Sequence, residues 1–288
     1  MRPTVHPLHH ADTGTWSYVV ADPATRVAAI IDPVLDFDAK SAHVTSTSAQ
    51  KLLDIVERQA YDVRWLLETH AHADHLSAAQ WLKQRLPAAT LAIGTGIRTV
   101  QETFAATLDP DGALATDGSQ FDRLFGDDER FEIGCLPARA IPVPGHTRDS
   151  LAYLIGDALF TGDSLFMPDA GTARCDFPGG DAATLYRSIR RLYDGLPDDT
   201  RVFVCHDYGP GGREVACETT IGEQRRSNFH VRDGVDENAF VTLRKARDAT
   251  LAMPALILPS LQVNLRGGAL PEPESNGVRY LKLPLNQL

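Results

Sequence analysis

Four side chains of types that commonly bind metal ions stand within six consecutive residues of this 288-residue chain. They lie in the segment Thr69-His70-Ala71-His72-Ala73-Asp74-His75 and are His70, His72, Asp74 and His75. Imidazole and carboxylate groups are the usual protein ligands of zinc, iron and manganese. A polar surface turn would account for one or two histidines, but this density predicts a metal centre.

Three more candidate ligands lie downstream, each after a short apolar segment with the composition of a β-strand. They are His146, Asp163 and His206. A single histidine or aspartate after a strand is common in ordinary turns, so each of the three alone is weak evidence for a metal site. Side chains at strand ends are held in place by the sheet, while the loops that follow leave room for ligands. The ordered set therefore predicts one convergent pocket.

The composition excludes several classes of partner. Hydrophobic residues make up 43% of the chain and charged residues 23%, which is ordinary for a soluble globular protein. The formal net charge of -10, without a block of lysine and arginine, argues against nucleic acid or an anionic membrane as the main partner. We expect no transmembrane segment and a cytoplasmic location. Irregular spacing predicts free thiols for Cys135, Cys175, Cys205 and Cys217.

Helices and strands that would position the ligands alternate along the chain. An antiparallel hairpin is predicted over residues 16–31, and a helix over 48–59 with Thr47 as its cap leads into a strand over 63–67. Further predicted elements are helices over 76–86, 182–193 and 237–252, strands over 90–93 and 202–204, and a short helix with a long connection over 104–128. We expect a catalytic domain over residues 1–217 and a C-terminal extension, 218–288, packed on it.

The ordered ligand set resembles the metallo-β-lactamase superfamily over roughly residues 8–215. The resemblance implies an α/β (α+β) fold, namely an αββα sandwich of two mixed β-sheets flanked by helices. Within this superfamily, the segment Gly171-Thr172-Ala173-Arg174-Cys175-Asp176-Phe177 and the run His206-Asp207-Tyr208 resemble the persulfide dioxygenase branch, including bacterial forms from sulfide detoxification. Ala173 stands where that branch has a glycine.

For a persulfide dioxygenase, the resemblance implies one Fe(II) per chain, bound by the catalytic residues His70, His146 and Asp163. Such a triad leaves positions open for a persulfide sulfur and for O2. The implied reaction oxidises glutathione persulfide, or a related low-molecular-weight persulfide, with O2 and water to sulfite and thiol. The remaining candidates would orient these ligands or bind a second metal, and they are His72, Asp74, His75 and His206.

Two residues are candidates for substrate binding. Arg174 has a planar guanidinium that suits a substrate carboxylate, although a structural salt bridge would equally explain it. Tyr208 could donate a hydrogen bond to the substrate or could be a core tyrosine. Cys175 is interpreted as an inert thiol, because the sequence places no base and no cation but Arg174 beside it. A homodimer is suggested by family likeness alone.

Two other functions compete with the dioxygenase. In a two-zinc, glyoxalase II-like thiolester hydrolase, one metal would be bound by His70, His72, His146 and Asp163. The second Zn(II) would be bound by Asp74, His75, His206 and the shared Asp163. A recognisable basic C-terminal segment for clamping glutathione is missing from the sequence, which argues against this hydrolase. The other competitor is a non-catalytic metal or sulfide sensor, whose signature would be an absence of turnover.

Overall fold

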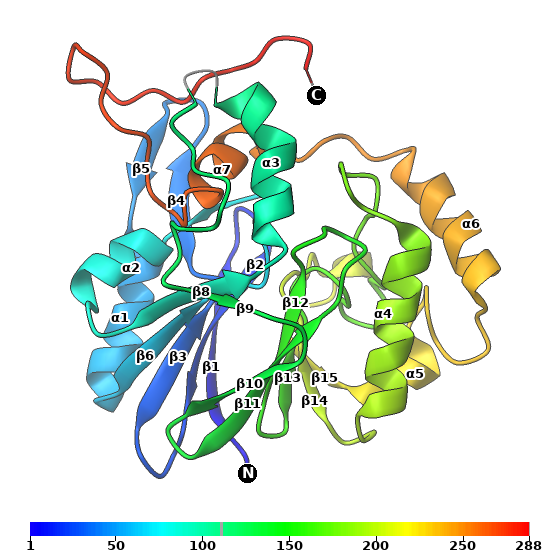
Figure 1. Cartoon of the computed structure of the whole chain (residues 1–288). Coiled ribbons are helices and arrows are strands. Elements are labelled where there is room, and N and C mark those ends of the chain that lie inside the picture. Colours follow the sequence, from blue (N-terminus) through cyan, green and yellow to red (C-terminus); the bar gives the residue numbers. More distant parts are fainter. Residues whose placement is uncertain (110–111, 288) are drawn as a thin grey trace.

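The computed structural model describes residues 1–109 and 112–287, in which two β-sheets pack face to face between layers of helices (Figure 1). In these residues the first sheet has six strands in the order β1-β2-β3-β6-β8-β9. The strands are β1 (Thr4–His10), β2 (Thr15–Ala21), β3 (Val27–Ile31), β6 (Asp62–Leu67), β8 (Thr90–Gly94) and β9 (Arg123–Phe125). The sheet is mixed, because β1, β2 and β3 pair antiparallel whereas β3, β6, β8 and β9 pair parallel.

The second sheet follows in the sequence and is also mixed. Its strands are β10 (Glu129–Ile133), β11 (Leu136–Pro142), β12 (Leu151–Ile155), β13 (Ala158–Phe160), β14 (Arg201–Phe203) and β15 (Glu218–Thr220), in that spatial order. Only the pair β13 and β14 is parallel among the described strands of this sheet. A small sheet at one end of the molecule consists of β4 (Val34–Asp38), β5 (His43–Thr45) and β7 (Leu76–Ser77).

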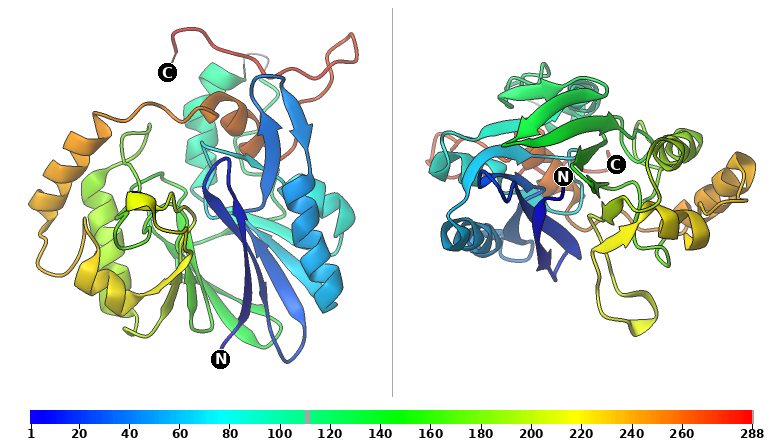
Figure 2. Two further views of the ribbon diagram at one scale, coloured as in Figure 1. Left: turned by 180° about the vertical axis from the view of Figure 1, so that it is seen from behind. Right: turned by 90° about the horizontal axis from the view of Figure 1, so that it is seen from below.

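Helices cover the outer face of each large sheet (Figures 1 and 2). On the first sheet these are α1 (Thr47–Gln59), α2 (Ala79–Arg85), α3 (Ile97–Leu108) and α7 (Ile257–Asn264). On the second sheet they are α4 (Ala182–Gly195) and α5 (Ile221–Ser227), and α6 (Glu237–Asp248) packs against α4. A single 3-10 turn, η1 (Pro210–Gly212), lies in the loop after β14. No helix in the described residues combines the length and the apolar content needed to cross a membrane.

The layers follow from the alternation of side chains along each strand, which places successive residues on opposite faces of a sheet. In β2, Val19 and Ala21 pack against the helices of the first sheet, whereas Tyr18 and Val20 face the second sheet. In the second sheet, Ile141 of β11 faces away from the first sheet and packs against the second layer of helices. Both sheets are therefore buried on both faces, and the predicted αββα sandwich is confirmed.

The predicted hairpin is present as β2 and β3, but it does not open the fold. Strand β1 precedes it and pairs with β2 from Thr4 to His10. This strand is not apparent from the sequence, because most of its residues are polar and Pro7 interrupts it. Proline is compatible with a strand at the edge of a sheet, where one side of the backbone needs no partner.

The predicted cap of α1 is wrong. The residue before the helix is Ser46 and no side chain caps it from that position. Instead, the Asp36 carboxylate of β4 accepts hydrogen bonds from the Ser48 backbone amide at 2.8 Å and from its hydroxyl at 2.7 Å. A carboxylate from another strand thus satisfies a free amide at the helix start, as a local cap would.

Several predicted boundaries shift. The helix expected over residues 76–86 begins only at Ala79, because residues 76–77 pair with β4 as strand β7. Helix α6 ends at Asp248, four residues before the predicted end at residue 252. Part of the connection predicted over 104–128 is the edge strand β9, and residues 110–111 lie outside the described residues. Strand β15 lies beyond the predicted domain boundary at residue 217 and belongs to the second sheet.

Candidate metal centre

The predicted ligands meet because each one lies in the loop directly after a strand. His70 follows β6, His146 follows β11, Asp163 follows β13 and His206 follows β14. The C-terminal ends of β6, β11, β13 and β14 converge at one edge of the sandwich. Each strand is fixed by its neighbours, so the position of each side chain is determined by the sheets and not by a mobile loop.

Two histidines and one aspartate form the inner part of the cluster. His70, His146 and Asp163 are buried, and one potential ligand atom of each lies within 4.8 Å of the others. The Asp163 Oδ2 atom is 3.6 Å from His146 Nε2 and 4.0 Å from His70 Nε2. The outward nitrogens are also used: His146 Nδ1 lies 2.7 Å from the Arg174 carbonyl oxygen and His70 Nδ1 lies 3.0 Å from Thr69 Oγ1. These contacts fix both rings with Nε2 directed into the cluster.

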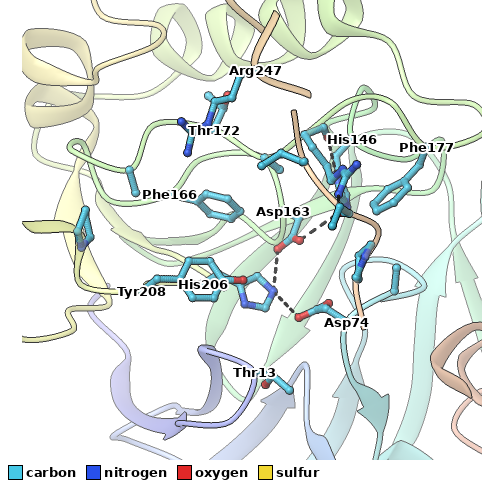
Figure 3. A pocket seen from close by; sticks show the side chains of 18 of the residues that line it. Thr13, Asp74, His146, Asp163, Phe166, Thr172, Phe177, His206, Tyr208 and Arg247 are labelled. Carbon is cyan, nitrogen blue, oxygen red and sulfur yellow. Dashed lines mark hydrogen bonds and ion pairs between the residues drawn. The ribbon is translucent and has the colours of Figure 1, made fainter. Parts of the chain in front are cut away.

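The other oxygen of Asp163 belongs to a second group. Its Oδ1 atom lies 3.3 Å from His206 Nε2, and Asp74 Oδ2 lies 3.2 Å from the same nitrogen. Figure 3 shows Asp163 between His146 on one side and His206 with Asp74 on the other. His75 joins this side, since it forms a group with His72 and Asp74. The single Asp163 carboxylate therefore connects two sets of potential ligands.

The cluster fits a metal ion because it leaves buried polar atoms without partners. A buried polar atom without a hydrogen bond costs free energy, so native proteins rarely leave several in one place. Within the described residues, the atoms in this condition include His70 Nε2, His72 Nδ1, His75 Nε2, His206 Nε2, Asp74 Oδ2 and Asp163 Oδ1. Nitrogen and carboxylate oxygen donors suit zinc, iron or manganese.

His72 differs from the other histidines because two buried carboxylates lie behind it. Its Nε2 atom is 3.1 Å from Asp32 Oδ1 and 3.7 Å from Glu68 Oε2. Asp32 also accepts hydrogen bonds from the Thr69 backbone amide at 2.7 Å and from the Thr69 hydroxyl at 2.9 Å. The Ser77 hydroxyl donates to Glu68. The acids therefore hold the loop of the metal cluster from beneath and orient the His72 ring.

Burial and neighbouring charges move the pKa values of these groups in opposite directions. Burial favours neutral His72, but the Asp32 and Glu68 carboxylates outweigh it and raise the pKa of His72 to about 10. For Glu68, burial and then the Asp32 charge raise the pKa to about 8. Burial, followed by the neighbouring His72, lowers the pKa of His75 to about 3. His75 is therefore neutral at neutral pH, as a metal-binding imidazole must be.

A cavity of about 760 Å³ opens beside the cluster. Its floor contains Asp74, His146, Asp163 and His206, which come from both groups of the cluster. Apolar side chains form much of the wall, among them Phe166 and Phe177 (Figure 3). Phe229, Leu251, Pro254 and Leu256 also line it. The wall from residue 251 to residue 256 belongs to the C-terminal extension. This size is typical of a site for a small organic molecule.

Arg174 lies in the wall of the cavity, but its guanidinium is already paired. Its Nε and Nη2 atoms donate to the two Asp176 oxygens at 2.6 and 2.7 Å, and Nη1 donates to the Ala252 carbonyl at 2.7 Å. The guanidinium also lies 4.9 Å from the centre of the Phe177 ring. In this arrangement Arg174 joins the loop after β13 to the chain after α6.

Tyr208 and Cys175 occupy different environments. Tyr208 lines the mouth of the cavity, is 66% exposed, and lies parallel to His206 with 5.9 Å between ring centres. Its hydroxyl has no hydrogen-bond partner among the described residues, which leaves it available to a substrate. Cys175 is buried, and burial raises the pKa of its thiol well above the ordinary value. A thiol held protonated in this way is inert, in line with the interpretation from the sequence.

Sequence reasoning missed the two acids behind His72. Asp32 had a usable signal, because it follows the apolar strand residues Ile30 and Ile31 in the same way that Asp163 follows β13. Glu68 had none, since a single glutamate at a strand end is commonly exposed. Arg247 was missed as well. It lines the cavity and, in the described part of the chain, has no ion pair or hydrogen bond to its side chain.

The sequence model of the Metallo-beta-lactamase superfamily matches residues 10–206, which include every candidate ligand. The chain belongs to the metallo-beta-lactamase superfamily. Several relatives match this chain over nearly its whole length. A "Beta-lactamase hydrolase-like protein" of Xylella fastidiosa is 52% identical over 99% of the chain, and the chain spans 65% of that relative's length. "Glyoxylase B2" of Dictyostelium discoideum is 47% identical over 96% of the chain and 95% of the relative.

More distant members of the superfamily carry a different name. The human mitochondrial protein named persulfide dioxygenase ETHE1 is 28% identical over 84% of the chain and 82% of its own length. Among solved structures, ETHE1 from Myxococcus xanthus superposes with a TM-score of 0.74 at 29% identity, covering 92% of this chain and 100% of that one. The fold is thus that of the superfamily, and the names of its members include both hydrolase and dioxygenase activities.

Proposed function

We propose that this protein is a persulfide dioxygenase that converts a low-molecular-weight persulfide to sulfite and a thiol, as part of sulfide detoxification. The balanced reaction is R–S–SH + O2 + H2O → R–SH + SO3²⁻ + 2 H⁺, in which the terminal sulfur is oxidised and O2 is reduced. The observation that carries the proposal is the buried group of His70, His146 and Asp163. Two histidines and one carboxylate are the donor set of non-haem Fe(II) enzymes that use O2.

The likeness to proteins named ETHE1 supports this proposal, in sequence and in fold. The metal would be one Fe(II) per chain at the triad. Iron in that position supplies the redox chemistry that joins O2 to sulfur. The residues His72, Asp74, His75 and His206 would then surround the triad and orient it without completing a second site. For His72 this agrees with the Asp32 and Glu68 carboxylates, which lie 3.1 and 3.7 Å from its Nε2 atom.

The chain's own residues position the substrate and keep water away. Phe166 and Phe177 line the cavity next to the cluster and form an apolar passage for the persulfide end. The exposed Tyr208 hydroxyl would donate a hydrogen bond to the substrate at the cavity mouth. Arg174 supports the site indirectly, because its backbone carbonyl orients His146 and its guanidinium holds the wall at Ala252. Positioning of this kind accounts for much of the rate gain when a cofactor performs the chemistry.

Arg247 is the side chain that we propose binds the anionic end of the substrate. Three arginines line the described cavity, but Arg174 is paired with Asp176 and Arg244 is paired with Asp248. Arg247 keeps its guanidinium free in the described residues and lies at the rim (Figure 3). A thiol carrier with carboxylates, such as glutathione, would place a carboxylate there while its persulfide reaches the triad.

Replacing Arg247 by alanine is expected to raise KM for glutathione persulfide by roughly 5- to 30-fold, which corresponds to about 1–2 kcal/mol for a charged hydrogen bond from an exposed side chain. The kcat should change little, because the residue lies away from the reacting sulfur. Steady-state sulfite formation measures both constants. Lys245→Ala is the matched control, since it removes an exposed cation from the same helix outside the cavity. An unchanged KM in Arg247→Ala would remove Arg247 from the substrate site.

A two-metal thiolester hydrolase is the second candidate. The observation that favours it is the group of Asp74, Asp163 and His206, whose ligand atoms also lie within 4.8 Å of one another. With Asp163 shared, the two groups could hold two metal ions that activate a water for attack on a carbonyl. The name of the Dictyostelium relative, Glyoxylase B2, points in the same direction.

Dependence on O2 separates the two candidates. We expect the iron-loaded protein to form sulfite from glutathione persulfide in air and to form none under argon, with slow or absent hydrolysis of S-lactoylglutathione in both. A hydrolase would cleave S-lactoylglutathione equally fast with and without O2, because water is its only co-substrate. Fast hydrolysis under argon together with no sulfite in air would replace the proposed function by the hydrolase.

A further inference from the structure

The C-terminal end of α7 lies directly beneath the loop that carries the metal cluster. Asn264 is the last residue of this helix and is only 5% exposed. Its side-chain Nδ2 donates hydrogen bonds to the carbonyl oxygens of His72 and His75, each at 2.8 Å. Its Oδ1 accepts a hydrogen bond from the Ser77 backbone amide at 2.8 Å. One side chain thus satisfies three backbone groups of the loop.

These three contacts reach across the chain, since 192 positions separate Asn264 from His72 and 189 separate it from His75. The two carbonyls belong to residues whose side chains lie in the metal cluster. A buried backbone carbonyl needs a donor, and its position fixes the direction of the side chain on the same residue. On the other side of the loop, the Asp149 carboxylate accepts a hydrogen bond from the Ala71 amide at 2.8 Å. The loop is held between Asp149 and Asn264.

The segment around Asn264 is itself fixed. The Gln101 side chain of α3 donates to the Leu265 carbonyl at 2.9 Å. A few residues later the backbone of Gly268, at a φ of 86°, passes so close that a Cβ on it would lie 2.9 Å from the Ser77 carbonyl oxygen. Glycine is required there because a side chain would push the loop away. Contacts through Asn264 and Gly268 press the extension against the loop at two places.

We propose that Asn264 is a positioning residue of the metal centre and that the C-terminal extension thereby sets the geometry of His72 and His75. The extension does more than cover the sandwich, because its residues 251–256 form the cavity wall and its Asn264 holds the metal loop. This inference rests on the metal centre of the proposed function but not on which reaction occurs there. It would hold for the dioxygenase and for the hydrolase alike.

Cobalt binding tests the inference without any measurement of activity. Asn264→Ala and Asn264→Asp are compared with the natural chain by titration of the metal-free protein with Co(II). Aspartate has nearly the shape of asparagine but replaces the two donated hydrogen bonds by a negative oxygen facing two carbonyls. We expect a weakening of Co(II) binding of about 10- to 100-fold, the loss typical of residues that orient metal ligands, because the loop that Asn264 holds also carries the ligand His70. We also expect a changed visible absorption spectrum, which reports ligand geometry.

Gln262→Ala is the matched control. Gln262 is buried in the same helix and binds the backbone of Lys282 in the tail, and within the described residues it makes no hydrogen bond to the metal loop. It should lower the midpoint of thermal unfolding but leave the Co(II) affinity and spectrum unchanged. Folded Asn264 variants with natural Co(II) affinity and spectrum would overturn the proposal. So would failure of both variants to fold in the presence of metal, which would make Asn264 a residue of the fold alone.

Discussion

Asp163→Ala is expected to remove bound metal and sulfite formation together. Its two oxygens face different groups of the cluster, at 3.6 Å from His146 and 3.3 Å from His206, so alanine breaks both at once. The loss should exceed the roughly 10- to 100-fold weakening caused by removing a residue that merely orients a ligand. His70→Ala should have the same effect, because a triad that loses one of three ligands cannot hold iron firmly. Metal analysis after gel filtration, with sulfite measured on the same fractions, gives the result.

Asp169→Ala provides the control for this pair. Asp169 also lines the cavity but is half exposed and paired with Arg213, outside the metal cluster. We expect it to retain metal and most of its activity. Full metal content and full activity in Asp163→Ala would show that the metal is bound elsewhere in the protein, and the assignment of the triad would have to be abandoned.

Asp32→Ala is expected to cost about 3–5 kcal/mol in the free energy of unfolding, the usual cost of removing one partner of a buried ion pair. His72 Nε2 would lose its carboxylate partner at 3.1 Å, and the Thr69 amide would lose an acceptor at 2.7 Å. Because the His72 ring would also lose its orientation, metal affinity should fall as well. Urea unfolding of the metal-free protein measures the stability, and a metal titration measures the affinity.

Asp36→Ala serves for comparison, because Asp36 is also an aspartate that accepts a backbone amide, here that of Ser48. It is part-buried and acts as a cap for α1, so its removal should cost only about 0.5–2 kcal/mol and should not change metal affinity. Equal losses of stability in the two variants would contradict the idea that Asp32 is one half of a buried pair with His72.

The convergence of the candidate ligands could be predicted from the sequence because each of them follows a local rule. His70, His146, Asp163 and His206 each follow an apolar segment, and strands recognised in this way converge wherever their ends share one edge of a sandwich. The same reasoning recovers β2, β3, β6, β8 and α4 within a few residues. For these elements the spacing of apolar residues agrees with the tertiary structure, and prediction from sequence succeeds where the two agree.

The rest depends on contacts between distant residues, for which local pattern holds no signal. The cap of α1 comes from Asp36 and not from Thr47, because a neighbouring strand brings a carboxylate to the helix start. Arg247 lies in an amphipathic helix and Asn264 at the end of a short helix that is largely buried, and neither sequence pattern marks these residues. Their roles appear only when the C-terminal extension is packed against the metal loop and the cavity. The ion pair between Arg174 and Asp176 also could not be predicted, because residue spacing does not determine side-chain geometry.

We propose above all that this protein oxidises a persulfide with O2 and that His70, His146 and Asp163 would hold the one iron ion that this reaction needs. The most direct test of this proposal is O2 uptake by protein purified without oxygen and loaded with iron, measured on addition of glutathione persulfide and with metal content determined on the same sample. We predict rapid uptake with one sulfite formed per O2 consumed, at close to one iron per chain, the stoichiometry that a facial triad implies. No uptake by a sample that holds two metal ions per chain would contradict the account.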